Sequence, residues 1–135
     1  MRLSTKGRNA VMAMMELAIR QRRGQVNLRE LATSQGISVS YIEQIFARLR
    51  RHELVKATRG PGGGYRLGRP ADEITIAEII ASVEAPLAGM HSGEQAAGAD
   101  EGDELSHDLW RRLSRKIYDF LNGITLAQSV AQPRL

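Results

Sequence analysis

The sequence contains no cysteine among its 135 residues. It therefore has no disulfide, no thiolate metal ligand and no cysteine nucleophile. It also lacks a run of about 18 apolar residues, and its first ten residues contain no apolar signal core. These absences exclude the usual signals for export and membrane insertion, so we expect a cytoplasmic protein that does not associate with a membrane.

Aromatic residues are scarce, at 4% of the chain, although the apolar fraction of 42% is ordinary for a globular protein. A chain of this length fits one small domain plus an arm, because a single core usually occupies about 100 to 200 residues. A core with so few aromatic side chains is expected to gain further apolar surface from a partner.

Charge is unevenly distributed along the chain, whose formal net charge is +4. Residues 1–67 hold 13 Lys and Arg against 4 Asp and Glu, whereas residues 68–103 hold 1 against 8. A basic first half favours a polyanion-binding surface, because phosphate neutralisation dominates nucleic-acid affinity. A solvated charged surface with no polyanion partner is the alternative that charge alone leaves open.

Apolar residues at three- and four-residue spacing predict a first helix from the N-cap Ser4 to about Arg22. A second, short helix follows Asn27 and stops at Gly36. Ser38 then caps a third, amphipathic helix. Its inward positions are Ile42, Ile45, Phe46 and Leu49. Two helices separated by a few residues that include glycine match the helix-turn-helix spacing, in which the second helix enters the major groove of DNA.

A hairpin is predicted after the third helix. Residues 54–58 and 65–67 are short strand-like runs, and the RGPGGG between them predicts a turn with unusual backbone angles. No Lys-Ser, Lys-Thr or helix start follows these glycines, so a nucleotide-binding loop is disfavoured. Arg59 at the tip suits insertion into a narrow minor groove, where negative potential is concentrated.

The second half of the chain predicts a fourth helix, a loop and a long fifth helix. Thr75 and Glu78 form a capping box, and residues 85–104 are rich in glycine and acidic residues, which favours a mobile loop. A stripe of apolar residues then steps by four along the long helix: Leu105, Leu109, Leu113, Ile117 and Leu121. Pairing with a second copy would cover this stripe, and packing back on its own domain is the alternative.

Three segments together resemble the IscR-like branch of the Rrf-type bacterial transcription regulators: MRLSTKGRNAVMAM, GISVSYIEQIFARLRRHELVKATRGPGGGYRL and LWRRLSRKIYDFLNGITL. The resemblance covers nearly the whole chain, and the RGPGGGY wing is its most specific motif. It implies a mainly α fold, with a winged helix-turn-helix domain at 1–84, a loop at 85–104 and a dimerisation helix with a C-terminal segment at 105–135. It also implies a homodimer that binds a pseudo-palindromic promoter site in double-stranded DNA.

The resemblance assigns roles to the recognition helix and the wing. Ser40, Glu43 and Gln44 resemble base readers, and serine, glutamine and glutamate are able to hydrogen-bond base edges. Tyr41 and Arg50 resemble backbone or groove contacts, whereas Arg59 and Gly60 resemble a minor-groove contact. The complete candidate interface is Ser38, Ser40, Tyr41, Glu43, Gln44, Arg48, Arg50, Arg51, Arg59 and Gly60. One departure from the branch is Asn9, where an aromatic residue is common.

The larger departure concerns iron. In cluster-binding members of this branch, three cysteines and a following histidine hold an iron–sulfur cluster, and the corresponding positions here resemble Ser92, Gly98, Glu104 and His107. Serine, glycine and glutamate cannot together replace three cysteine thiolates, so we expect no cluster and no other cofactor. A site for a harder divalent metal is a less favoured alternative; its residues would be His91, Asp100, Glu101, Asp103, Glu104 and His107.

The favoured function is a sequence-specific DNA-binding regulator, expected to be a repressor, which acts as a homodimer without a cluster. The alternative is an adaptor whose acidic loop docks a protein or the hard metal. An enzyme is not expected, because the sequence offers no pairing of histidine with a nucleophile, no metal-ligand spacing and no phosphate loop.

Overall fold

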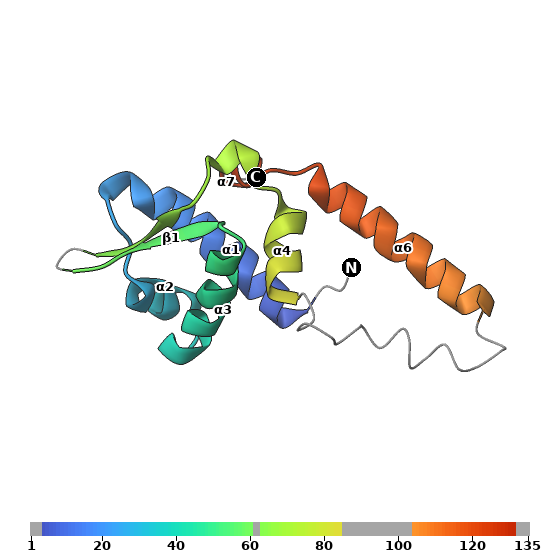
Figure 1. Ribbon diagram of the computed structural model, residues 1–135, viewed down its shortest axis with the longest axis horizontal. Helices are drawn as coiled ribbons and strands as arrows, with labels where there is room; N and C mark the ends of the chain where they lie inside the picture. The colour runs from blue at the N-terminus through green and yellow to red at the C-terminus, as the bar shows by residue number, and fades with distance from the viewer. Residues whose placement is uncertain (1–3, 61–62, 85–103, 132–135) are drawn as a thin grey trace.

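The computed structural model describes residues 4–60, 63–84 and 104–131. Helices pack around one another beside a two-stranded antiparallel hairpin, which extends away from them (Figure 1). The elements are α1 (Thr5–Arg20), η1 (Gln21–Arg23), α2 (Leu28–Gln35), α3 (Val39–Arg51), β1 (Val55–Thr58), β2 (Gly64–Leu67), η2 (Ala71–Glu73), α4 (Ile76–Glu84), α6 (Glu104–Asn122) and α7 (Leu126–Ala131). This order confirms the mainly α class with a hairpin wing.

The predicted helix caps are present. The side chain of Ser4 accepts a hydrogen bond from the Gly7 amide at 3.2 Å, and that of Ser38 accepts from the Tyr41 amide at 3.1 Å. Asn27 caps α2 by accepting from the Arg29 amide at 2.7 Å. These bonds satisfy amides that have no partner within the helix, so the helices start where the short polar side chains stand.

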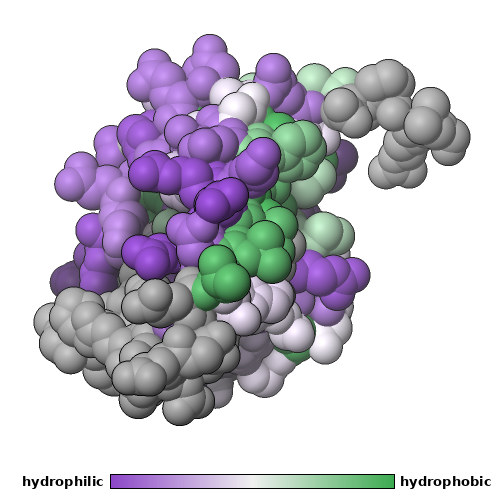
Figure 2. Space-filling view, turned by 90° about the vertical axis from the view of Figure 1, so that its right-hand side faces the viewer, coloured by the Kyte–Doolittle hydropathy of each residue, from purple (hydrophilic) through white to green (hydrophobic). Residues whose placement is uncertain are grey.

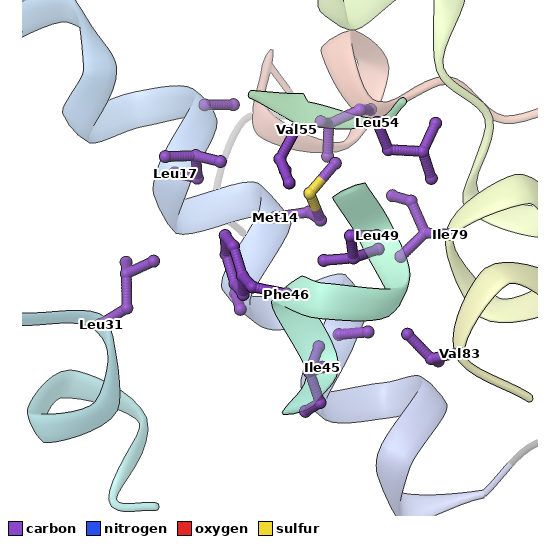
Figure 3. Close-up of a cluster of buried hydrophobic side chains, with 14 of the residues drawn as sticks. Met14, Leu17, Leu31, Ile45, Phe46, Leu49, Leu54, Val55, Ile79 and Val83 are labelled. Carbon is purple, nitrogen blue, oxygen red and sulfur yellow. The ribbon is translucent and has the colours of Figure 1, made fainter. Parts of the chain in front are cut away.

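The inner face of α3 forms the centre of the core. Its four predicted inward residues, Ile42, Ile45, Phe46 and Leu49, are all completely buried. Figure 3 shows three of them, Ile45, Phe46 and Leu49, in one cluster with Met14 of α1 and Val83 of α4. Burying one such side chain contributes about 1.5–3 kcal/mol, so the core determines which face of α3 points outward.

The hairpin pairs Val55 with Leu67 and Thr58 with Gly64. β1 starts one residue later than predicted, because the Leu54 amide donates to the Leu49 carbonyl at 3.0 Å in the turn that ends α3. β2 starts one residue earlier than predicted, because Gly64 pairs with Thr58. Outside the hairpin, Tyr65 and Val26 exchange two backbone hydrogen bonds at 2.8 and 3.0 Å. The wing is therefore held to the segment that precedes α2.

The capping box of α4 is also confirmed. The Thr75 amide donates to Glu78 Oε1 at 3.0 Å, and the Glu78 amide donates to Thr75 Oγ1 at 3.1 Å. Arg69 Nη2 donates to the second carboxylate oxygen of Glu78 at 2.9 Å. The link between the hairpin and α4 is thereby fixed at both ends.

The C-terminal segment returns to the N-terminal core. After α6, the Leu126 amide donates to the Ile74 carbonyl at 2.8 Å, and the Leu126 side chain is 0% exposed within the core. α7 therefore helps to complete the core that α1, α3 and α4 form. The predicted limits of the loop stay a prediction, since residues 85–103 lie outside the described part of the chain.

One carboxylate ties α1 to the end of α2. Glu16 accepts hydrogen bonds from Ser34 Oγ at 2.8 Å and from Gln35 Nε2 at 2.7 Å, and it also pairs with Arg20. Burial raises the pKa of Glu16, but these three donors outweigh it and hold the pKa below its ordinary value. The ionised carboxylate thus stabilises the contact between the two helices.

We predict that Leu126→Ala lowers the free energy of unfolding by about 2–5 kcal/mol, because it removes a buried side chain and leaves a cavity. Urea denaturation followed by circular dichroism measures the change. Met12→Ala is the control, since Met12 is exposed on α1, and it should change stability much less. Equal effects of the two substitutions would contradict the packing of α7 into the core.

We predict that Glu16→Gln reduces the acid sensitivity of folding. A carboxyl whose pKa is lower in the folded state stabilises the protein above its unfolded pKa, and this contribution disappears as pH falls through the folded pKa. The variant should be less stable than the parent at neutral pH, and the difference should shrink below the ordinary glutamate value of 4.5. Urea titrations at several pH values test this, with exposed Glu43→Gln as the control.

Candidate nucleic-acid interface

The outer face of α3 presents the predicted base-reading residues to solvent. Ser40, Glu43 and Gln44 are exposed in the first turns of the helix, opposite its buried inner face. Their hydroxyl, carboxylate and amide groups offer both donors and acceptors for base edges. The arrangement therefore matches the orientation that a recognition helix needs.

The basic residues of α3 lie further along the helix. Arg50 and Arg51 are exposed in its last turn, whereas Arg48 is half-buried. Ser38 is exposed at the other end, and its oxygen is used to cap the helix. Positive charge thus follows the base-reading turns, where the helix would leave the groove and meet phosphates.

Tyr41 is held from behind by α1. Its ring packs against the core, and its hydroxyl oxygen accepts a hydrogen bond from Asn9 Nδ2 at 3.4 Å. Because the oxygen already has a donor, the phenolic hydrogen is available for an acceptor such as a phosphate. The departure at Asn9 thereby acquires a physical role, which the sequence alone did not indicate.

The wing presents Arg59 and Gly60, which are both exposed. Gly60 has a φ of 94°, a region that side-chain-bearing residues seldom adopt, and a Cβ on Gly63 would lie 2.3 Å from the Thr58 carbonyl oxygen. The unusual backbone angle predicted for this turn is confirmed at Gly60, whereas Gly63 lies where the neighbouring backbone leaves no room for a side chain. Residues 61–62 of the turn lie outside the described residues.

A pair of aromatic rings connects the wing to α3. The rings of Phe46 and Tyr65 meet edge to face, with centroids 5.1 Å apart and planes at 76°. Such pairs are favourable beyond the area they bury. This contact was not among the sequence predictions, although two of the few aromatic residues lie on the predicted recognition helix and wing.

The predicted apolar stripe of α6 divides into two parts. Leu105, Leu109 and Leu113 are 85%, 64% and 41% exposed, whereas Ile117 and Leu121 are half-buried, and Leu121 packs against the core of its own chain. Figure 2 shows a strongly hydrophobic patch beside hydrophilic residues on the side of the molecule where α6 lies. The stripe therefore packs against the core of its own chain at Leu121 and is exposed at the end that begins with Leu105.

Most of the positions considered for metals lie outside the described residues. These positions are His91, Ser92, Gly98, Asp100, Glu101 and Asp103, and the side chain of Glu104 also lies outside. His107 is half-buried on α6. Over 4–60, 63–84 and 104–131, no group of three or more His, Cys, Asp or Glu side chains is arranged to hold a metal. Over the same residues, no helix is long and apolar enough to cross a membrane.

A family model described as "Rrf2: Iron-dependent Transcriptional regulator" matches residues 3–132. The chain belongs to the Rrf2 family. The HTH-type transcriptional regulator IscR of Sodalis glossinidius is 48% identical over 137 residues, which cover 100% of this chain and 82% of that protein. IscR of Serratia proteamaculans is 48% identical over 132 residues, which cover 96% and 79%.

Solved structures agree with this assignment. The structure of T. potens IscR superposes with a TM-score of 0.76 at 34% identity, covering 100% of this chain and 93% of that one. Oxidised Staphylococcus aureus CymR superposes with a TM-score of 0.77 at 30% identity, and both chains are covered completely. The winged-helix fold is therefore confirmed, and this Rrf2 protein is a DNA-binding transcriptional regulator.

The family description names iron, but the donor set does not fit an iron–sulfur cluster. Such clusters are held mainly by cysteine thiolates, which are soft anionic ligands. The sequence has no cysteine, and histidine alone does not supply that chemistry. The family match thus spans residues 3–132, but no cysteine within it is present to hold a cluster.

Proposed function

We propose that this regulator binds a pseudo-palindromic promoter site as a homodimer and represses transcription without an iron–sulfur cluster. The observation that carries the proposal is the exposed polar face of α3 beside the exposed Arg59 of the wing, with the two elements joined by the Phe46–Tyr65 contact. A helix and a wing held in one orientation contact adjacent grooves of the same duplex.

The proposed interface has a division of roles. Ser40, Glu43 and Gln44 contact base edges in the major groove, and Arg59 with Gly60 enters the minor groove. The remaining contacts position the helix on the sugar-phosphate backbone. They are made by Ser38, Tyr41, Arg48, Arg50 and Arg51.

The proposed dimer forms through α6. This helix of 19 residues leaves Leu105, Leu109, Leu113 and Phe120 exposed on one face, beyond the reach of its own core. A second copy covers the same surface with its own α6, which is the usual twofold solution for such a face. A twofold dimer also presents two copies of α3, so it matches the two halves of a pseudo-palindrome.

Regulation follows from the missing ligands. Without cysteine there is no cluster to gain or lose, so DNA binding is either constitutive or controlled by another signal. A dimer that occupies a promoter blocks it, which makes repression the simplest outcome. The protein acts in the cytoplasm, where bacterial DNA lies, and it has no catalytic role. The adaptor alternative depends on residues 85–103 and therefore rests on the sequence alone.

We predict different effects for two arginines. Arg59→Ala should weaken binding to the preferred sequence by about 1–3 kcal/mol and relax its sequence preference, because it removes a minor-groove contact. Arg51→Ala should weaken binding to all sequences, because it removes a phosphate contact. It should also reduce the slope of log affinity against log salt concentration by about one. Fluorescence anisotropy at two salt concentrations, with specific and random duplexes, measures both effects. An unchanged sequence preference in Arg59→Ala would refute the wing assignment.

We predict that Leu113→Glu gives monomers, because it places a charge within the exposed part of the apolar stripe. Sedimentation velocity measures the association state. Arg115→Glu is the matched control, since it introduces the same side chain on the opposite face of α6, and it should leave the dimer intact. A dimeric Leu113→Glu variant would show that the interface lies elsewhere.

A further inference from the structure

One large apolar side chain interrupts the polar outer face of α3, where the other exposed apolar residue is the small Ala47. Val39, the first residue of this helix, is 37% exposed between the exposed Ser38 and Ser40. Every other large hydrophobic residue that is exposed in the described ranges lies on α1 or α6. These residues are Met12, Ile19, Leu105, Leu109, Trp110, Leu113, Tyr118 and Phe120.

The fold gives no reason for valine at this position. Ile37 and Tyr41 pack against the core and Ile42 lies within it, but Val39 belongs neither to the described core cluster nor to the residues that line it. A β-branched residue loses side-chain freedom in a helix, and the first turn favours proline or acidic residues. The valine therefore adds nothing that helix formation or core packing requires.

We propose that Val39 contacts the C5-methyl group of a pyrimidine in the major groove, an inference that rests on α3 being the recognition helix. The thymine methyl is the one apolar group among the base edges of this groove, and apolar side chains recognise it by contact. Val39 and Glu43 are four residues apart, so they lie on one face of the helix. An apolar contact at Val39 beside a hydrogen-bonding group at Glu43 distinguishes neighbouring bases by different chemistry.

The test removes single methyl groups from DNA. Duplexes that bind the full-length protein are first selected from a random pool, and each thymine of the preferred site is then replaced by deoxyuridine, which lacks only the methyl. One position in each half-site should lose affinity about fourfold, which corresponds to ~0.8 kcal/mol for one buried methyl-sized group. In Val39→Ala the same replacement should have no effect.

Controls separate the contact from folding and from other surfaces. Val39→Ala should retain the parent's unfolding temperature, because alanine favours the helix, and exposed Met12→Ala should keep the full methyl dependence. Cytosine and 5-methylcytosine are also compared at the same position. A fourfold gain in affinity from 5-methylcytosine shows that the protein recognises the methyl group on either base, whereas no gain shows that it recognises the methyl group of thymine alone.

Two results would overturn the proposal. In the first, replacing any single thymine by deoxyuridine leaves the affinity of the parent protein unchanged. In the second, Val39→Ala loses as much affinity on that replacement as the parent does. In both cases a selected site still binds specifically, so the proposed recognition by α3 survives. If the selection yields no preferred duplex at all, recognition by α3 fails and the Val39 contact fails with it.

Discussion

Burial of Phe46 is the constraint on which the DNA-binding surface depends. This side chain is fully buried on the inner face of α3, and its ring also meets Tyr65 of the wing. One residue therefore sets both the rotation of the recognition helix and the position of the hairpin beside it. Because cores are close-packed, neither element moves without disturbing the other. The spacing between the two proposed DNA contacts, on α3 and on the wing, is thus determined by the core.

The same core also determines where α6 is attached. The Ile76 amide donates to the Ile124 carbonyl at 2.9 Å, and Leu126 is buried immediately afterwards, so the C-terminal end of α6 is anchored beside α4. The other end of α6 carries Leu105, which is mostly exposed. A dimer formed through α6 would consequently fix the separation of two recognition helices through the packing of each core.

Local chemistry made much of this fold predictable. Ser4, Asn27 and Ser38 start helices because their side chains bond to amides two or three residues away, and Gly36 ends one with a left-handed φ of 69°. The exposed side of α3, which carries the candidate interface, was predictable from the spacing of its buried residues. The wing turn was equally readable from its glycines.

Contacts between distant segments were not predictable in this way. Leu121 resembled the other members of the α6 stripe, yet it packs against its own core because the chain turns back just after it. The burial of Leu126 and the bond from Asn9 to Tyr41 likewise depend on which elements become neighbours. Periodicity identifies an apolar face, but tertiary packing decides what covers it.

The two helices on either side of residues 85–103, α4 and α6, are each tied to the N-terminal core. On one side, Glu84 accepts a hydrogen bond from the Ser4 amide at 3.0 Å and so ties the end of α4 to the start of α1. On the other side, α6 is anchored through residues 124–126. Because α1 and α4 both pack on the buried face of α3, the position of α3 is linked to both of these helices.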